Sequence, residues 1–157
     1  MNRGIVLTLL SLLMGMLVCC EDYKDCNSPV DTSLGIRFYR QTHDTDRDTT
    51  LPGLTAYGIG RADSLLAKRL PTSSLFVPLR QDQDTTAFFL GPDSTRRTGD
   101  TLTLAYTRTL HFISSGCGFT TYYQLDTVYS TRHFIDSLAV PQKKIVTTHA
   151  TNVKIYY

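Results

Sequence analysis

Two stretches of alternating residues near the middle of the chain constrain the fold most. Along residues 101–113 the even positions are apolar except for Arg108, and the odd positions are mostly threonine. Along residues 119–129 the odd positions are again apolar or threonine. A period of two indicates a β-strand, because successive side chains of a strand point to opposite faces. The break between the stretches contains Gly116 and Gly118, so together they predict a β-hairpin.

Shorter apolar segments separated by turn residues fill the rest of the chain. Residues 75–79 are predicted to form an edge strand, because Pro78 cannot donate a ladder hydrogen bond. Leu65, Leu66 and Leu70 suggest a short helix over residues 62–70. Further strands are expected at residues 34–40, 54–60, 86–90, 134–140, 144–148 and 153–157. Eight or nine strands predict an all-β domain over residues 34–157, an antiparallel β-sandwich, Ig-like in outline, with a closed barrel as the alternative.

The N-terminus has the pattern of an export signal. Asn2 and Arg3 precede an apolar run over residues 5–18, broken only by Thr8, Ser11 and Gly15. As a helix this run would span roughly 21 Å, which is shorter than the ~30 Å hydrocarbon core of a bilayer. The run therefore predicts a signal peptide and not a membrane span.

The apolar run ends in Leu17-Val18-Cys19-Cys20, which resembles a bacterial lipobox. In such a motif a small residue precedes the cysteine that is acylated and becomes the new N-terminus. Cys20 fits that position better than Cys19, which would follow the bulkier Val18, although Gly, Ala or Ser is usual where Cys19 stands. The resemblance implies a lipoprotein signal peptide over residues 1–19, lipidation at Cys20 and attachment to the membrane through the N-terminal lipid. A soluble secreted protein cleaved nearby is the alternative.

Two of the four cysteines remain once residues 1–19 are removed and Cys20 is acylated. These are Cys26 and Cys117, and an even pair in an exported protein suggests a disulfide. Two buried free thiols are the alternative. A third hypothesis makes Cys117 the nucleophile of an envelope hydrolase with His111 or His133 as its base. The sequence shows no electropositive setting of the kind that would activate such a thiol.

Residues 20–33 are predicted to be a lipidated tether. They are polar, and Asn27-Ser28-Pro29 is a turn signal. If Cys26 is bridged, only residues 21–25 stay free, and five residues reach at most about 17 Å. The domain would then sit close to the membrane. The acidic pair Glu21-Asp22 resembles the short signal that directs some lipoproteins of the Bacteroidota to the cell surface.

Net charge and charge placement argue against a nucleic-acid partner. The chain carries +2, and removing residues 1–19 takes away Arg3 alone and leaves +1. The basic residues are scattered, without the basic stripe that a phosphate backbone requires. Arg108 is the one misfit on the apolar face of the hairpin. It is expected at the rim of the sheet, or paired with an acid such as Asp126 or Asp136.

No metal site, cofactor or catalytic set is predicted. The acids of residues 44–48 are spaced like the start of a calcium loop, but Thr49 and Thr55 occupy the positions that need glycine and glutamate. The four histidines show no close ligand spacing. No paired carboxylates, nucleophile elbow or phosphate-binding loop stands out.

A tripeptide of Asp, then Thr or Ser, then an apolar residue or Thr resembles the O-glycosylation acceptor of exported Bacteroidota proteins. It begins at Asp48, Asp63, Asp84, Asp93, Asp100, Asp126 and Asp136. Because a glycan needs an exposed loop, Thr49, Thr85 and Ser94 are the expected sites, and Thr127, on the apolar side of the hairpin, should be spared. The alternative is that Asp favours turns and Thr begins strands.

The order of these features across the mature chain resembles an uncharacterised lipoprotein family of the Bacteroidota, a domain of unknown function. The features are the lipobox, Cys26, the strand LTAYGIG, the hairpin with Cys117-Gly118-Phe119 and the ending NVKIYY. The resemblance implies an outer-membrane lipoprotein, periplasmic or surface-facing. A non-enzymatic binding or structural role is expected, with an envelope protein or a glycan as partner. The rival is the hydrolase built on Cys117.

Overall fold

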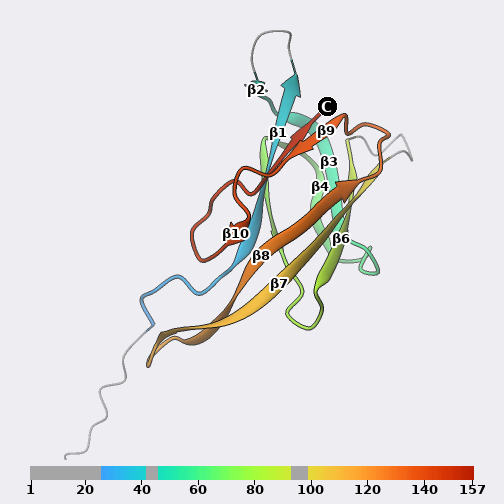
Figure 1. Ribbon diagram of the computed structural model, residues 1–157. Helices are drawn as coiled ribbons and strands as arrows, with labels where there is room; N and C mark the ends of the chain where they lie inside the picture. Colours follow the sequence, from blue (N-terminus) through green and yellow to red (C-terminus); the bar gives the residue numbers. More distant parts are fainter. Residues whose placement is uncertain (1–25, 42–45, 93–98) are drawn as a thin grey trace, which may run out of the picture.

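The computed structural model describes residues 26–41, 46–92 and 99–157, which form eleven strands in two open sheets packed on each other (Figure 1). The predicted all-β sandwich is confirmed, and the closed barrel is not. The strand count exceeds the expected eight or nine because several strands are only two or three residues long. Within the described residues no helix could cross a membrane. The predicted signal peptide and Cys20 lie outside them.

The smaller sheet has five strands arranged around β1. Its members are β1 (Ser33–Gln41), β2 (Asp46–Asp48), β5 (Ser74–Pro78), β9 (Ser137–Ala139) and β11 (Val153–Tyr156). The order is β2-β1-β11-β9, and β5 pairs with β1 as the predicted edge strand. β1 and β11 run parallel, with Ile36 opposite Val153 and Phe38 opposite Ile155. This parallel pair departs from the expected purely antiparallel sandwich.

The larger sheet has six antiparallel strands in the order β10-β8-β7-β6-β3-β4. Its members are β3 (Leu51–Gly58), β4 (Leu65–Thr72), β6 (Thr85–Gly91), β7 (Asp100–Ser114), β8 (Gly118–Ser130) and β10 (Lys144–Ile145). β7 and β8 form the predicted hairpin, the longest pair in the molecule. The apolar side chains of both sheets meet in one core, which includes Phe38, Val77, Leu90, Leu104, Leu125 and Ile155.

The predicted helix over residues 62–70 is wrong, because this segment forms most of β4. Its backbone pairs with the open edge of β3 through a register with several shifts. Ala67 is its one buried apolar residue, whereas Leu65 and Leu70 are exposed. Arg69 adopts a φ of 53° in this irregular strand. Hydrogen bonding to an available sheet edge therefore overrides the weak local helix pattern.

The predicted facing of Thr127 is also wrong, because a β-bulge changes the phase of β8. Tyr106 lies opposite Leu125 and Ala105 lies opposite Thr127, so Asp126 is an extra residue between them. A single extra residue moves every later side chain to the other face. Thr127 is consequently exposed, and Val128 packs against the core in its place.

The hairpin reaches past the sheet that covers it. On β7, Leu102, Leu104 and Tyr106 are buried, but Leu110 and Phe112 on the same face are 68% and 53% exposed. In Figure 1 the far end of β7 and β8 extends to the lower left, beyond the other strands. The apolar alternation that indicated a buried face thus continues into a part of the hairpin that has no opposing sheet.

Candidate functional site

An open cleft of about 660 Å³ lies between the turn that follows β3 and the β5–β6 loop. Residues 58–61 form one wall, residues 78–83 form the other, and the first residues of β6 lie between them. Gly60, with a φ of 82°, supplies the left-handed backbone of the turn.

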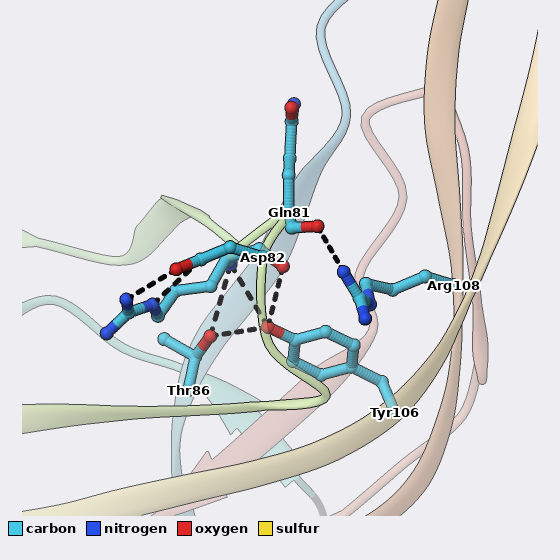
Figure 2. Close-up of polar contacts among 6 residues, drawn as sticks. Gln81, Asp82, Thr86, Tyr106 and Arg108 are labelled. Carbon is cyan, nitrogen blue, oxygen red and sulfur yellow. Dashed lines mark hydrogen bonds and ion pairs between the residues drawn. The ribbon is translucent and has the colours of Figure 1, made fainter.

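Tyr106 fastens the β5–β6 loop to the sandwich. Its buried hydroxyl lies 2.6 Å from the Thr86 hydroxyl and donates to the carbonyl of Arg80 at 3.0 Å. The backbone N–H of Arg80 donates to both hydroxyl oxygens, at 3.0 Å to Tyr106 and 3.2 Å to Thr86 (Figure 2). If the Thr86 hydroxyl donates to Tyr106, every polar hydrogen of this group has an acceptor. The network holds the backbone of the loop in one position beside the cleft.

Arg80 and Asp82 form a bidentate ion pair on the same loop. Arg80 Nε lies 3.1 Å from Asp82 Oδ1, and Nη2 lies 2.8 Å from Oδ2 (Figure 2). The hydrogen bond with Arg80 lowers the pKa of Asp82, and the same bond raises the pKa of Arg80. Both side chains are well exposed, so the pair orders the rim of the cleft and adds little to stability.

Arg108 lies at the rim of the sheet, as expected, but its partner is Asp84 rather than Asp126 or Asp136. Its Nε donates to Asp84 Oδ1 at 2.7 Å, and its Nη1 donates to the carbonyl oxygen of Gln81. The backbone N–H of Tyr106 also donates to the carbonyl of Asp84 at 2.9 Å. Tyr106 and Arg108, two successive inward positions of β7, therefore hold the two ends of the β5–β6 loop, at Arg80 and Asp84.

The cleft is suited to binding a neutral polar ligand. Arg80 is neutralised by Asp82, while Gln81 and Gln83 present amide groups and Arg61 adds a guanidinium group. These groups offer hydrogen-bond donors and acceptors without a strong net charge. The cleft lining contains no cysteine or histidine, and the described residues hold no group of three side chains that could bind a metal ion.

A second polar cluster surrounds Asp100, whose side chain is fully buried. Its carboxylate accepts hydrogen bonds from the backbone N–H groups of His133, Phe134 and Ile135 and from the hydroxyl of Thr131. His133 Nδ1 also lies 2.8 Å from Oδ1. Burial raises the pKa of Asp100, but these hydrogen bonds outweigh it and lower the pKa from 3.8 to about 2. The cluster fixes the turn after β8.

Cys117 is joined to Cys26 by a disulfide with a sequence separation of 91, as the cysteine count predicts. The sulfur is therefore not available as a thiolate nucleophile. The two histidines considered as its base make other contacts. His111 stacks on the Tyr122 ring, and His133 is hydrogen-bonded to Asp100. The geometry offers no support for the hydrolase hypothesis.

The three expected glycosylation sites differ in their accessibility in the structure. Thr85 is exposed at the start of β6 and lines the cleft. Thr49 is half-buried, and its hydroxyl lies 3.0 Å from the Tyr157 hydroxyl. Ser94 lies outside the described residues. Glycosylation remains a prediction, with Thr85 as its most accessible described acceptor.

A protein-family model described as a family of unknown function, DUF6452, matches residues 53–157, which are 105 of the 157 residues. The chain belongs to the DUF6452 family. No curated protein and no solved structure matches it. The match covers Cys117, Asp100, Tyr106 and the whole β5–β6 loop of this DUF6452 protein, whereas β1 and Cys26 precede it.

Sequence analysis did not single out the two polar clusters of this DUF6452 protein. Asp100 could have been found, because it occupies the same even phase as Leu102, Leu104 and Tyr106 and is therefore directed inward. The contact between Tyr106 and the Arg80 backbone had no such signal. It depends on how the β5–β6 loop folds back, which strand periodicity does not report.

Proposed function

We propose that this DUF6452 protein is a lipid-anchored lipoprotein of the outer membrane in a Bacteroidota cell envelope, with a binding or structural role. The domain faces the periplasm or the cell surface and serves an envelope complex or glycan capture. The Cys26–Cys117 disulfide carries the proposal, because disulfides persist in oxidising compartments outside the cytoplasm. The apolar run over residues 5–18 and the lipobox-like Leu17-Val18-Cys19-Cys20 support it.

The binding role rests on the cleft beside the β5–β6 loop. The Tyr106 network holds the loop backbone in place, so its exposed polar side chains surround the cleft on a positioned backbone. Preorganised polar groups of this kind favour binding because less conformational entropy is lost when the ligand arrives. An enzymatic role has no comparable support, because Cys117 is bridged.

Fatty-acid labelling in the native host tests the anchor. The wild-type chain and a Cys19→Ala control are expected to incorporate an alkyne-tagged fatty acid, whereas Cys20→Ser is not, because Cys20 supplies the acylated group. Incorporation is read on the purified protein, so retention of an uncleaved signal peptide in the membrane does not confuse the result. Label on Cys20→Ser, or none on the wild type, would refute lipidation at Cys20.

Photo-crosslinking in intact cells tests the binding role. A diazirine amino acid is placed at Gln83, which lines the cleft, and at Ser137, which is exposed on β9 in the other sheet, as the control. We expect a specific adduct at Gln83 only, and its mass distinguishes an envelope protein from a glycan. Identical adducts at both positions, or none at Gln83, would count against the cleft as the binding site.

A further inference from the structure

The far end of the β7–β8 hairpin exposes an apolar face that the other described residues leave uncovered. Leu110, Phe112 and Phe119 are 68%, 53% and 61% exposed. Phe112 lies opposite Phe119 in the ladder, with ring centroids 5.1 Å apart. We call Leu110, Phe112 and Phe119 the tip patch. Exposed aromatic and leucine side chains gathered in one place indicate an interaction surface.

The tip patch continues the core-facing side of the hairpin. Tyr106 and Tyr123 on that side are buried and in edge-to-face contact. Tyr123 lies opposite Arg108 in the ladder, and Arg108 forms an ion pair with Asp84 of the β5–β6 loop. This is the last position at which that loop covers the core-facing side of the hairpin. Beyond this pair the side chains have the same apolar character but no opposing sheet.

The N-terminal end of the described chain is fastened to the same tip. Cys26 is bridged to Cys117 in the hairpin turn. Farther along, the Thr120 hydroxyl donates to the Val30 carbonyl at 2.7 Å, and the Thr32 hydroxyl donates to the Thr121 carbonyl at 2.8 Å. Figure 1 shows the start of this blue segment beside the hairpin tip at the lower left. The chain therefore enters the domain at the tip and runs along the edge of β8 toward β1.

The attachment of Cys26 at the hairpin tip indicates that the surface in contact with the tip patch is the lipid bilayer. Residues 21–25 separate Cys26 from Cys20, so the two Cα atoms are six residue steps apart and lie at most about 21 Å from each other. If Cys20 carries acyl chains in the bilayer, the tip cannot lie farther than that from the lipid surface.

The composition of the tip suits a lipid surface. Residues 109–125 contain no Lys, Arg, Asp or Glu, so burial of this region in the headgroup layer desolvates no ammonium, guanidinium or carboxylate group. Aromatic rings favour the membrane interface, and Tyr122 adds one at the same end of the hairpin, on the opposite face, where it stacks on His111. A second apolar contact beside the acyl chains of Cys20 strengthens attachment and restricts rotation of the domain about a short tether.

We infer that the tip patch inserts into the membrane leaflet in which Cys20 is anchored, and that the hairpin is a second membrane contact that sets the orientation of the domain. The inference rests on the lipid anchor proposed above. With the patch in the lipid, the long axis of the hairpin stands away from the membrane and lifts the β5–β6 cleft toward the aqueous phase.

Tryptophan fluorescence of the acylated full-length protein in phosphatidylcholine vesicles tests the inference, because the natural chain contains no tryptophan. Phe119→Trp replaces one exposed aromatic ring of the tip patch with another. Tyr129→Trp is the matched control, because Tyr129 is 57% exposed on the same strand, about 33 Å from Phe119. We expect blue-shifted emission and quenching by bromine on the lipid acyl chains for Phe119→Trp, and neither change for Tyr129→Trp.

Three outcomes would overturn the inference. Emission of Phe119→Trp that matches that of Tyr129→Trp places the tip patch in water. A blue shift without bromine quenching that disappears on dilution of the protein in the vesicles indicates contact between two copies. A bromine effect of equal size at both positions indicates that the domain lies flat. Acylation of the sample is first checked by intact mass, so that failure of the anchor is distinguished from failure of the tip contact.

Discussion

The hydroxyl oxygens of Tyr106 and Thr86 lie 2.6 Å apart beneath the β5–β6 loop, and both accept from the backbone N–H of Arg80. One side chain comes from β7 and the other from β6, so the contact joins two neighbouring strands and a loop. Because both groups are buried, neither hydroxyl can exchange these partners for bulk water without opening the structure.

Tyr106→Phe is expected to lower the free energy of unfolding by about 1–3 kcal/mol, because it removes one of the two acceptors of the Arg80 N–H and the donor to the Arg80 carbonyl. Urea denaturation measures the change. Hydrogen exchange should also show faster exchange in residues 80–84. Tyr129→Phe, at an exposed position on β8, serves as the control and is expected to stay within about 0.5 kcal/mol of the wild type. Equal losses in the two variants would refute the structural role of the Tyr106 hydroxyl.

Asp100 predicts a loss of stability at acidic pH. Its pKa is about 2 in the folded protein and is expected near 3.8 when unfolded, so the folded state binds fewer protons between these values. The Asp100 carboxylate contributes on the order of 2 kcal/mol to the free energy of unfolding. This contribution is fully present above about pH 4 and is lost as the pH falls from there through about 2. Chemical denaturation across this window measures it.

Asp100→Asn is expected to be less stable than the wild type at pH 7, with the difference shrinking below about pH 4. Asp126→Asn is the matched control, since Asp126 is exposed at the β8 bulge. A wild-type and an Asp100→Asn curve that stay parallel from pH 7 to pH 2 would show that the Asp100 carboxylate is not the group responsible.

Gly35→Ala tests the packing of β1 against the segment before β11. An added Cβ would lie 2.1 Å from the Ala150 carbonyl oxygen. Two hydrogen bonds between Gly35 and Asn152 hold this segment close. The Gly35 N–H donates to Asn152 Oδ1 at 3.0 Å, and the Asn152 backbone N–H donates to the Gly35 carbonyl at 2.8 Å. We expect a loss of roughly 2–3 kcal/mol by urea denaturation. Gly58→Ala is the control, because no atom lies within 4 Å of its added Cβ. Similar stability of the two variants would contradict the close approach at Gly35.

Intact-mass measurement of the protein from its native host tests glycosylation. If the Asp-Thr tripeptides are acceptors, Thr85 should be modified before Thr49, because Thr85 is exposed while the Thr49 hydroxyl contacts Tyr157. Thr85→Val should remove one glycan mass, and Thr49→Val should remove little or none. A mass equal to that of the lipidated polypeptide alone would rule out the modification.

The parts of the fold that followed from sequence are those governed by local periodicity. The alternation of residues 101–113 and 119–129 identified the hairpin, and Pro78 identified an edge strand. The bulge at Asp126 could not be predicted from the sequence. The extra residue moves the following side chains to the other face of the sheet, but no residue type at this position signals a bulge. The strand at Leu65–Thr72 escaped detection for a related reason, since the edge of β3, and not its own sequence, organises it.

The candidate site was less predictable than the fold. The cysteine pair could be assigned because only two cysteines remained. The cleft depends on residues from β3, β6, β7 and the β5–β6 loop that have no shared spacing in the sequence. Its residues are also ordinary polar types, which carry no motif. Pairings between distant segments therefore decide the site.

The parallel pairing of β1 with β11 bears on how this protein is made. Gly35 and Asn152 are 117 residues apart, so during synthesis β1 leaves the ribosome long before its partner does. The smaller sheet cannot close on that side until residues 153–156 have emerged. Until then the edge of β1 is open to pairing with other chains, a known route to aggregation. A nascent chain stalled before Val153 should thus depend on chaperones, which the finished protein no longer needs.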